Sequence, residues 1–405
     1  MSLLPVEQAQ ERLIAGARRM ARTQTIPLGE AGGRALAAPL AARMTQPPFD
    51  NSAMDGYAVR AQDVSQLGNR LRVIGESAAG RSFPGVVGPQ EAVRIFTGAP
   101  VPAGADAVLL QEDAVRHENG VIENSFVLAR GRHIRPRGQD FVTHEEVLPA
   151  GTILDAGNLV VAAAMNHSEV TVYARPLVAL IATGDELVPV GETPGPDQII
   201  ASSIFGVSQL AREAGADIID LGIIADDHTA IGNAVARARA AGADIVVTLG
   251  GASVGDHDLV QAALVSSGME LDFWRIAMRP GKPLMVGSLG DARVLGLPGN
   301  PVSSMVCALL FLEPLVAYMS RRPMRTRNAT AIAATPLSAN DHRQDHLRAT
   351  LHRRDDGELE AHPFSQQDSS QMKIFARSDC LVVRPPRAAA VEAGARCAIL
   401  MLRDR

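Results

Sequence analysis

The chain has 405 residues, of which 46% are hydrophobic and 20% are charged, and this ordinary globular composition excludes a disordered or fibrous protein. Lys and Arg number 39 against 44 Asp and Glu, and only 3% of the residues are aromatic. The resulting net charge of −5 argues against a nucleic-acid-binding protein, which needs a basic surface or stacking aromatic side chains.

The N-terminal half predicts a helix followed by a lobe rich in β-strands. Apolar and charged residues alternate at helical spacing over residues 5–22. From about residue 44 to 151, short apolar runs such as LRVIG and DAVLLQ are separated by turn residues, which is typical of short strands. Asp155 precedes the helical run NLVVAAAM and is expected to cap it, because its carboxylate can accept the free amides of the first turn.

A different pattern occupies residues 175–323. Nearly continuous apolar runs are typical of strands covered on both faces, and they read LVALIATG, ADIIDLGII, DIVVTLGG, LDFWRIAM, PLMVG and RVLGLPG. Between several of them lie helical stretches, including SSIFGVSQLAREAG and HTAIGNAVARARAAG. This alternation predicts a parallel sheet with helices on both faces, and such sheets bind ligands at the carboxyl ends of their strands.

The residues after 327 predict a small all-β domain, because short, partly alternating runs are separated by turn residues. His342 and His346 in this region are spaced four apart. No Cys or third ligand accompanies them, so we interpret them as surface histidines and not as a zinc site.

Three features predict a soluble cytoplasmic protein. Cys307, Cys380 and Cys397 form no Cys-x-x-Cys pair, which fits a reducing compartment. The N-terminus has no basic start followed by an apolar block, so we expect no secretory signal. The apolar stretch 303–319 is short for a membrane span and contains Glu313 and Pro314, so we expect a buried helix that bends or ends near the proline.

Acids and glycines follow three of the predicted strands. TGDEL (183–187) follows the first, Asp226 and Asp227 follow the second, and GGASVGDHD (250–258) follows the third. Glycines at a strand end can aim backbone amides at an anion, whereas carboxylates repel phosphate unless a divalent cation lies between them. The combination predicts a magnesium–phosphate site, although each segment alone is equally consistent with a tight turn and a capping aspartate.

Two further segments offer positive charge and close backbone approach. Arg279 and Lys282 stand in RPGKP, where a rigid turn would present them to a phosphate or another dianion; ordinary surface charge is the alternative. GLPGNPVSS (296–304) is a strand end that enters a helix, which Asn300 or Ser303 can cap.

The β-rich lobe carries its own polar cluster around Asp55, Arg94, Thr97 and the segment 135–140. Arginines and acids gathered on loops would suit a second wall of an active site. Asp55 precedes Gly56, so a turn aspartate is the simpler interpretation of that residue.

A serine hydrolase is a weaker alternative. Gly251–Gly255 fits G-x-S-x-G, which would make Ser253 a nucleophile on a strand-to-helix turn. The acids crowded beside Ser253 disfavour the oxyanion that such an enzyme must stabilise.

Taken together, the motifs resemble the MoeA and gephyrin E-domain family of molybdopterin molybdenumtransferases. The matching segments run in order along nearly the whole chain and are SAMDGYA (52–58), FTGAPVPAGADAV (96–108), the Arg-x-x-Gly-x-Asp pattern (135–140), TGDEL, GGASVGDHD, RPGKP and GLPGNPVSS.

The resemblance implies an α/β plus β fold. It implies an elongated multidomain chain with a molybdopterin-binding, doubly wound parallel-sheet domain, a β-rich lobe and a small C-terminal β-barrel. The expected divisions are a discontinuous linking and dimerisation domain (1–26, 44–50 and 147–176), the β-rich lobe (27–43 and 51–146), the α/β domain (177–325) and the C-terminal β domain (326–405).

The resemblance also implies an activity: insertion of molybdenum from molybdate into adenylyl-molybdopterin, with Mg²⁺ and release of AMP. A homodimer is implied, with the active cleft between the α/β domain of one subunit and the β lobe of its partner. Molybdopterin adenylyltransferase and molybdoenzyme maturation proteins are possible partners, and neither nucleic acid nor membrane is expected. The alternative to catalysis is a non-catalytic molybdopterin-binding scaffold, which the many acids argue against.

Site residues follow from the resemblance position by position. The expected catalytic residues are Asp55, Thr97, Asp140, Glu186, Asp256 and Asp258. The expected substrate-binding residues are Arg135, Asp185, Asp226, Gly250, Gly251, Ser253, Gly255, Arg279, Lys282, Pro298, Pro301 and Ser303, the two prolines as shape-setting residues. The expected metal ligands are Glu186, Asp226 and Asp256. This chain departs from the family pattern at Gln139, at Ser203, at Arg279 in place of the more frequent Lys, and around Ser369 and Ser370.

Overall fold

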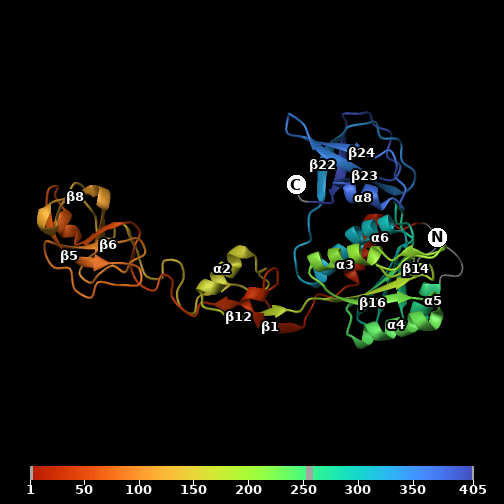
Figure 1. Ribbon diagram of the computed structural model, residues 1–405, viewed down its shortest axis with the longest axis horizontal. Helices are drawn as coiled ribbons and strands as arrows, with labels where there is room; N and C mark the ends of the chain where they lie inside the picture. Colours follow the sequence, from red (N-terminus) through yellow and green to blue (C-terminus); the bar gives the residue numbers. More distant parts are fainter. Residues whose placement is uncertain (1–2, 252–258, 404–405) are drawn as a thin grey trace. The chain divides into compact units, whose positions relative to one another are not determined.

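The computed structural model describes residues 3–251 and 259–403 (Figure 1). The chain forms two compact units, one made of residues 1–24, 33–35 and 173–405 and the other of residues 25–32 and 36–172.

The first unit is built on a six-stranded sheet. In spatial order its strands are β16 (Asp217–Ile224), β13 (Leu177–Thr183), β17 (Ile245–Leu249), β21 (Ala292–Leu297), β20 (Met285–Leu289) and β18 (Glu270–Trp274). The first four strands are parallel, as predicted, whereas β20 is antiparallel to both of its neighbours. A two-residue turn at Gly290 and Asp291 joins β20 to β21, and so short a connection permits only an antiparallel pair.

Helices cover both faces of this sheet, which confirms the predicted layering. Val178 and Leu180 of β13 lie in one core with α1 (Val6–Ala15), α3 (Ser203–Ala214) and α6 (Pro301–Cys307). Ala179 and Ile181 lie in a second core with α4 (His228–Ala240) and α5 (Leu259–Ser266). Successive side chains of a strand point to opposite faces, so both faces of β13 are buried.

The N-terminal helix ends earlier than the sequence predicts. It stops at Gly16, where a Cβ atom would lie 2.7 Å from Nη1 of Arg293, so the chain passes close to a buried arginine there. Leu13 of this helix is 1% exposed within the α/β core.

The apolar stretch near residue 310 is one continuous buried helix with a change of hydrogen bonding. A π-helical turn (Ala308–Leu312) links α6 to α7 (Glu313–Met319) just before Pro314, which cannot donate a backbone hydrogen bond. Glu313 is buried and accepts from Arg327 Nε at 2.9 Å. Within the described residues this is the one helix long and apolar enough to cross a membrane, and 83% of its apolar window is buried inside the protein.

The C-terminal residues of this unit form a closed barrel of five strands, as expected. Its strands are β23 (Gln344–Arg353), β24 (Leu359–Pro363), β22 (Asn328–Ala333), β26 (Arg396–Met401) and β25 (Cys380–Arg384), and β25 pairs with β23 to close the circle. A sixth strand, β19 (Met278–Arg279), comes from the α/β domain and pairs with β23. The short helix α8 (Met372–Arg377) in this domain was not predicted.

The second unit contains the predicted β-rich lobe. Its sheet has the order β7 (Ala107–Leu110), β4 (Gly56–Val59), β6 (Glu91–Ile95), β5 (Arg70–Ser77), β9 (Val121–Asn124) and β8 (Ala114–Arg116). Its short helical turns are η2 (Ala61–Val64), η3 (Gln111–Asp113) and η4 (Glu118–Gly120).

A separate small hydrophobic core is formed by segments that flank this lobe in the sequence. It holds α2 (Ala156–Ala164), β12 (Glu169–Tyr173), η1 (Leu28–Glu30) and the pair formed by β2 (Leu40–Ala41) and β11 (Glu146–Leu148). As predicted, Asp155 caps α2, accepting from the amide of Asn158 at 2.8 Å. β1 (Thr23–Pro27) pairs with β12.

The grouping of segments differs from the expected divisions at two places. Residues 27–43 pack with residues 147–172 and not with the β-rich lobe, because Leu36 and Leu40 are buried in the same core as Leu154 and Val170. The N-terminal residues group with the α/β domain, because α1 packs into its core.

His346 corrects the interpretation of the two C-terminal histidines as surface residues. His342 is exposed, but His346 is only 2% exposed on β23, with Nε2 3.2 Å from Gln344 Nε2. Burial lowers the pKa of His346 to about 4. Among the described residues, no three His, Cys, Asp or Glu side chains are placed to hold a metal ion together.

We predict that His346 makes the folded chain sensitive to mild acid. An unfolded histidine has a pKa of about 6.5, so as pH falls the unfolded state takes up a proton before the folded state does, and stability is lost between about pH 6.5 and pH 4. Urea unfolding at about pH 7.5 and pH 5 should show that His346→Gln loses roughly 2 kcal/mol less stability between the two conditions than the wild type. An identical loss in both proteins would contradict a neutral buried His346.

Candidate functional site

Four parallel strands end side by side in the α/β domain. Thr183 at the end of β13 pairs with Ile224 of β16, Ala182 pairs with Leu249 of β17, and Leu249 pairs with Leu297 of β21. The residues that follow these strands therefore start from one edge of the sheet, as the sequence predicts.

Three predicted acids cluster at this edge. The amide of Asp226 donates to Asp185 Oδ1 at 3.0 Å, which ties the ends of β16 and β13 together. The carboxylate of Glu186 folds back over Gly184, where an added Cβ atom would lie 2.5 Å from Glu186 Oε2. Loss of solvation, followed by the charges of Asp185 and Glu186, raises the pKa of Asp226. The carboxylates of Asp185 and Glu186 thus disfavour the ionised form of Asp226.

Two consecutive glycines, Gly250 and Gly251, lie next to the acids. Gly250 and Gly251 have φ angles of 106° and 63°, which side chains disfavour. A Cβ atom at Gly250 would overlap the carbonyl oxygen of Thr183, so the backbone passes directly over the end of β13. The amide of Gly250 donates to the carbonyl of Leu297 at 3.2 Å, so this amide supports the turn.

Part of the predicted site falls on the segment 252–258. Ser253, Gly255, Asp256 and Asp258 lie outside the described residues. The roles of Asp256 as a metal ligand and of Ser253 as an alternative nucleophile therefore stay predictions from the sequence.

The GLPGNPVSS segment enters α6 at the same edge. A Cβ atom at Gly299 would lie 3.4 Å from the Cα atom of Gly250, so the two glycine segments are adjacent. Pro298 accepts from the hydroxyl of Ser304 through its carbonyl, and Pro301 is the first residue of α6. Asn300 stands at the cap position without a side-chain capping bond, and Ser303 is 6% exposed.

The two predicted cations occupy different environments. The guanidinium of Arg279 pairs with Asp345 on β23 and lies 3.6 Å from Asp341, and these partners, Asp345 first, raise its pKa. Arg279 therefore fastens the RPGKP turn to the barrel. The carbonyl of Lys282 accepts from the amides of Ile276 and Leu284, which braces the turn, and its ammonium forms no ion pair within the described part of the chain.

In the β-rich lobe the structure brings Asp55 and Thr97 together. One carboxylate oxygen of Asp55 accepts from the amide of Thr97 at 2.7 Å and from its hydroxyl at 2.8 Å. These two bonds, with a smaller contribution from Arg94, lower the pKa of Asp55. Asp55 is therefore more than a turn residue, because it is an ionised carboxylate held against a threonine from another loop.

The other predicted residues of this lobe lie on adjoining segments. Arg135 on β10 (Ile134–Arg135) pairs with Asn51 on β3 (Asn51–Ser52), and the amide of Ser52 donates to Ala99 just after Thr97. Asp140 is exposed, and its amide donates to the carbonyl of Gln46 at 3.0 Å. Neither Arg135 nor Asp140 has a side-chain bond to the Asp55–Thr97 pair.

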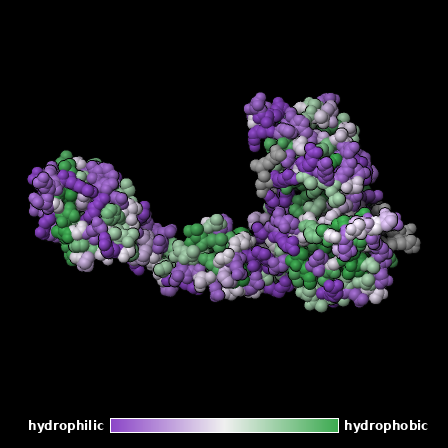
Figure 2. Space-filling view, in the orientation of Figure 1, coloured by the Kyte–Doolittle hydropathy of each residue, from purple (hydrophilic) through white to green (hydrophobic). Residues whose placement is uncertain are grey.

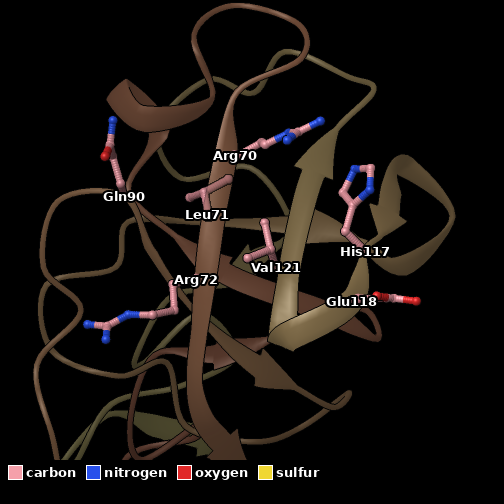
Figure 3. Close-up of a pocket in the computed structure, with 7 residues that line it drawn as sticks. All are labelled: Arg70, Leu71, Arg72, Gln90, His117, Glu118 and Val121. Carbon is pink, nitrogen blue, oxygen red and sulfur yellow. The ribbon is translucent and has the colours of Figure 1, made fainter.

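A cavity elsewhere in this lobe is not part of the candidate site. It has a volume of about 570 Å³ and is lined by Arg70, Leu71, Arg72, Gln90, His117, Glu118 and Val121, none of which was predicted (Figure 3). Figure 3 shows its polar side chains pointing apart, and Arg70 and Arg72 already pair with Glu123 at 3.0 Å and Glu91 at 2.7 Å.

Comparison with known proteins covers nearly the whole chain. Residues 4–166 match the model of the MoeA N-terminal region (domain I and II), residues 179–318 match the probable molybdopterin binding domain, and residues 330–402 match the MoeA C-terminal region (domain IV). The four strand ends and their acids therefore lie within the segment that matches the molybdopterin-binding model.

Individual relatives also match the chain over most of its length. The molybdopterin molybdenumtransferase of Haemophilus influenzae is 35% identical over 394 residues, which is 97% of each chain. That of a Nostoc species is 34% identical over 94% of this chain and 89% of its own length. The crystal structure of a molybdopterin biosynthesis MoeA protein from Pyrococcus horikoshii superposes over all of both chains with a TM-score of 0.82 at 28% identity. The chain thus belongs to the molybdopterin molybdenumtransferase family.

Proposed function

We propose that this chain is a molybdopterin molybdenumtransferase of molybdenum cofactor biosynthesis, which inserts molybdenum into molybdopterin. The observation that carries the proposal is the cluster of Asp185, Glu186 and Asp226 at the strand ends. This cluster lies beside Gly250 and Gly251, within the segment that matches the molybdopterin-binding model. Family membership favours this function over a non-catalytic scaffold or a hydrolase acting through Ser253.

The chemistry of the edge supports molybdate and adenylyl-molybdopterin as substrates. Both are oxyanions, and Lys282 is a cation on a braced turn without a carboxylate partner among the described residues. Glycines at 250, 251 and 299 let the backbone after β17 and β21 pack closely at the end of β13, which brings these strand ends together. AMP would be the leaving product when the adenylyl phosphate is cleaved.

The donor set fits Mg²⁺ as the required ion. Within the described ranges no three acidic, histidine or cysteine side chains form a metal cage by themselves. Mg²⁺ commonly binds through one or two carboxylates together with phosphate oxygens and water, so Glu186 and Asp226, with Asp256 as the sequence predicts, would suffice. Bound there, the ion would neutralise charge on the phosphate and offset the repulsion among the acids.

The residues of the chain then act by position and charge. Asp185 fixes Asp226 through the main chain, and Lys282 binds the anionic group that is transferred or released. In the β-rich lobe, Thr97 keeps the carboxylate of Asp55 ionised and oriented. Phosphoryl chemistry depends mainly on such positioning and electrostatics, so no covalent nucleophile is required.

The test of this function is molybdate-dependent release of AMP from adenylyl-molybdopterin. Asp226→Asn and Glu186→Gln should each lower the rate by roughly 100-fold or more, because each removes a charge that the phosphate-bound ion needs. Ser253→Ala should lower the rate far less than either acid variant, because Ser253 is expected to contact the substrate and not to act as a nucleophile. Asp227→Asn is the matched control, because Asp227 caps α4 by accepting from Ala230 at 2.8 Å and asparagine caps equally well. Full activity of Asp226→Asn, or an inactive Ser253→Ala beside active acid variants, would contradict the proposal.

We also propose a homodimer that associates through the apolar surface of α2. Figure 2 shows a hydrophobic patch over α2. Val160 on this helix is 69% exposed, and exposed Met44 and Val142 belong to the same unit. Contiguous exposed apolar surface of this kind marks interaction sites. In the dimer, the β-rich lobe of one subunit would supply Asp55 and Thr97 to the strand ends of the other, as in the expected family arrangement.

Light scattering at micromolar concentration tests the dimer. Val160→Glu should shift the chain towards monomer, because a charge would be buried in an apolar interface. Val190→Glu is the control, since Val190 is 59% exposed but lies in the other unit. A dimer that survives Val160→Glu unchanged would rule out this surface.

We further propose that the chain is cytoplasmic. We also propose that it makes transient contacts with molybdopterin adenylyltransferase or molybdoenzyme maturation proteins. The three cysteines are buried and form no Cys-x-x-Cys pair, which fits a reducing compartment.

A further inference from the structure

One arginine of the β-rich lobe contacts the neighbours of both Asp55 and Thr97. The guanidinium of Arg94 on β6 donates through Nη1 to the carbonyl of Gly56 at 3.0 Å. Its Cζ atom lies 4.9 Å from the ring centre of Phe96. Gly56 follows Asp55 and Phe96 precedes Thr97, so Arg94 bridges the two segments immediately beside the bonded pair.

A second set of contacts extends this bridge. Nη2 of Arg94 donates to Gln111 Oε1 at 2.7 Å, and the amide of Gln111 donates to the carbonyl of Asp55 at 3.2 Å. The same guanidinium lies 5.1 Å from the ring centre of Tyr57, which is 3% exposed. Arg94 therefore connects β4, β6 and η3 around the Asp55 segment.

The packing leaves little freedom for this segment elsewhere. A Cβ atom at Gly56 would overlap the carbonyl oxygen of Leu109, so β4 and β7 approach as closely as glycine permits. β6 pairs with the other side of β4, where Gly56 lies opposite Ile95. There Arg94 adds side-chain hydrogen bonds to Gly56 and Gln111, beside the two bonds from Thr97 that hold the Asp55 carboxylate.

We propose that Arg94 is a positioning residue for the transferase reaction, which holds Asp55 and Thr97 in register without touching the substrate. The inference rests on the proposed function of that pair. The positive charge of Arg94 adds a smaller effect in the same direction as the two bonds from Thr97, because it also lowers the pKa of Asp55.

The test measures kcat and KM for AMP release by the full-length chain. Arg94→Gln should lower kcat by roughly 10- to 100-fold and change KM for adenylyl-molybdopterin by less than about twofold, because a small displacement of a catalytic group slows the chemical step. Arg94→Lys should restore part of kcat, since it keeps the charge but not the planar fork. Arg116→Gln is the control, because Arg116 lies 6.0 Å from the Tyr57 ring and should leave kcat within about twofold of the wild type.

The outcomes separate this inference from the proposed function. Wild-type kcat in Arg94→Gln together with an inactive Asp55→Asn would overturn the role of Arg94 and leave the function standing. Full activity of Asp55→Asn would overturn the function assigned to the pair. If Arg94→Gln fails to fold, Arg94→Lys decides: a reduced kcat at unchanged KM supports positioning, and wild-type kcat contradicts it. Equal loss in the Gln and Lys variants, in parallel with a lowered melting temperature, would indicate a merely structural arginine.

Discussion

Repulsion among carboxylates at the ends of parallel strands is the constraint on which the site depends. The register of β16, β13, β17 and β21 brings their ends to one edge, so Asp185, Glu186 and Asp226 are neighbours because of the topology. Loss of solvation, followed by the charges of Asp185 and Glu186, raises the pKa of Asp226. The charges of Asp185 and Glu186 disfavour the ionised form of Asp226, which supports our proposal that this edge binds a cation together with an anionic ligand.

The rest of the unit holds this edge in place. Glycines allow the loops after β17 and β21 to pass within contact of each other, and α6 starts from the same point. The C-terminal barrel contributes through β23, which pairs with β19, and through Asp345 and Asp341, which both pair with Arg279. Arginine suits this bridging role better than lysine, because its planar fork reaches both Asp345 and Asp341. The departure from the more frequent lysine thus has a structural reason in this chain.

Much of this architecture could be predicted from local pattern. Continuous apolar runs predicted the buried strands β13, β16, β17 and β21, and Asp155 was predicted correctly as a helix cap because capping depends on three or four adjacent residues. The common edge of the acids followed from the same reasoning. The features that local pattern does not predict depend on contacts between distant residues. The Arg279–Asp345 pair joins residues 66 positions apart, and the burial of Leu36 beside Val170 groups residues 27–43 with a segment far along the chain. His346 was misjudged because nothing local shows that β23 closes a barrel.

The most direct test of the central claim is where a divalent ion binds. Crystals grown with Mn²⁺ in place of Mg²⁺, together with tungstate and AMP, would locate the ion by anomalous scattering. The account predicts a manganese peak in contact with the carboxylate of Glu186 or Asp226 at the strand ends, with oxyanion density on the side of Lys282. A manganese peak bound elsewhere, with the three acids free of metal while AMP is seated in the protein, would contradict it.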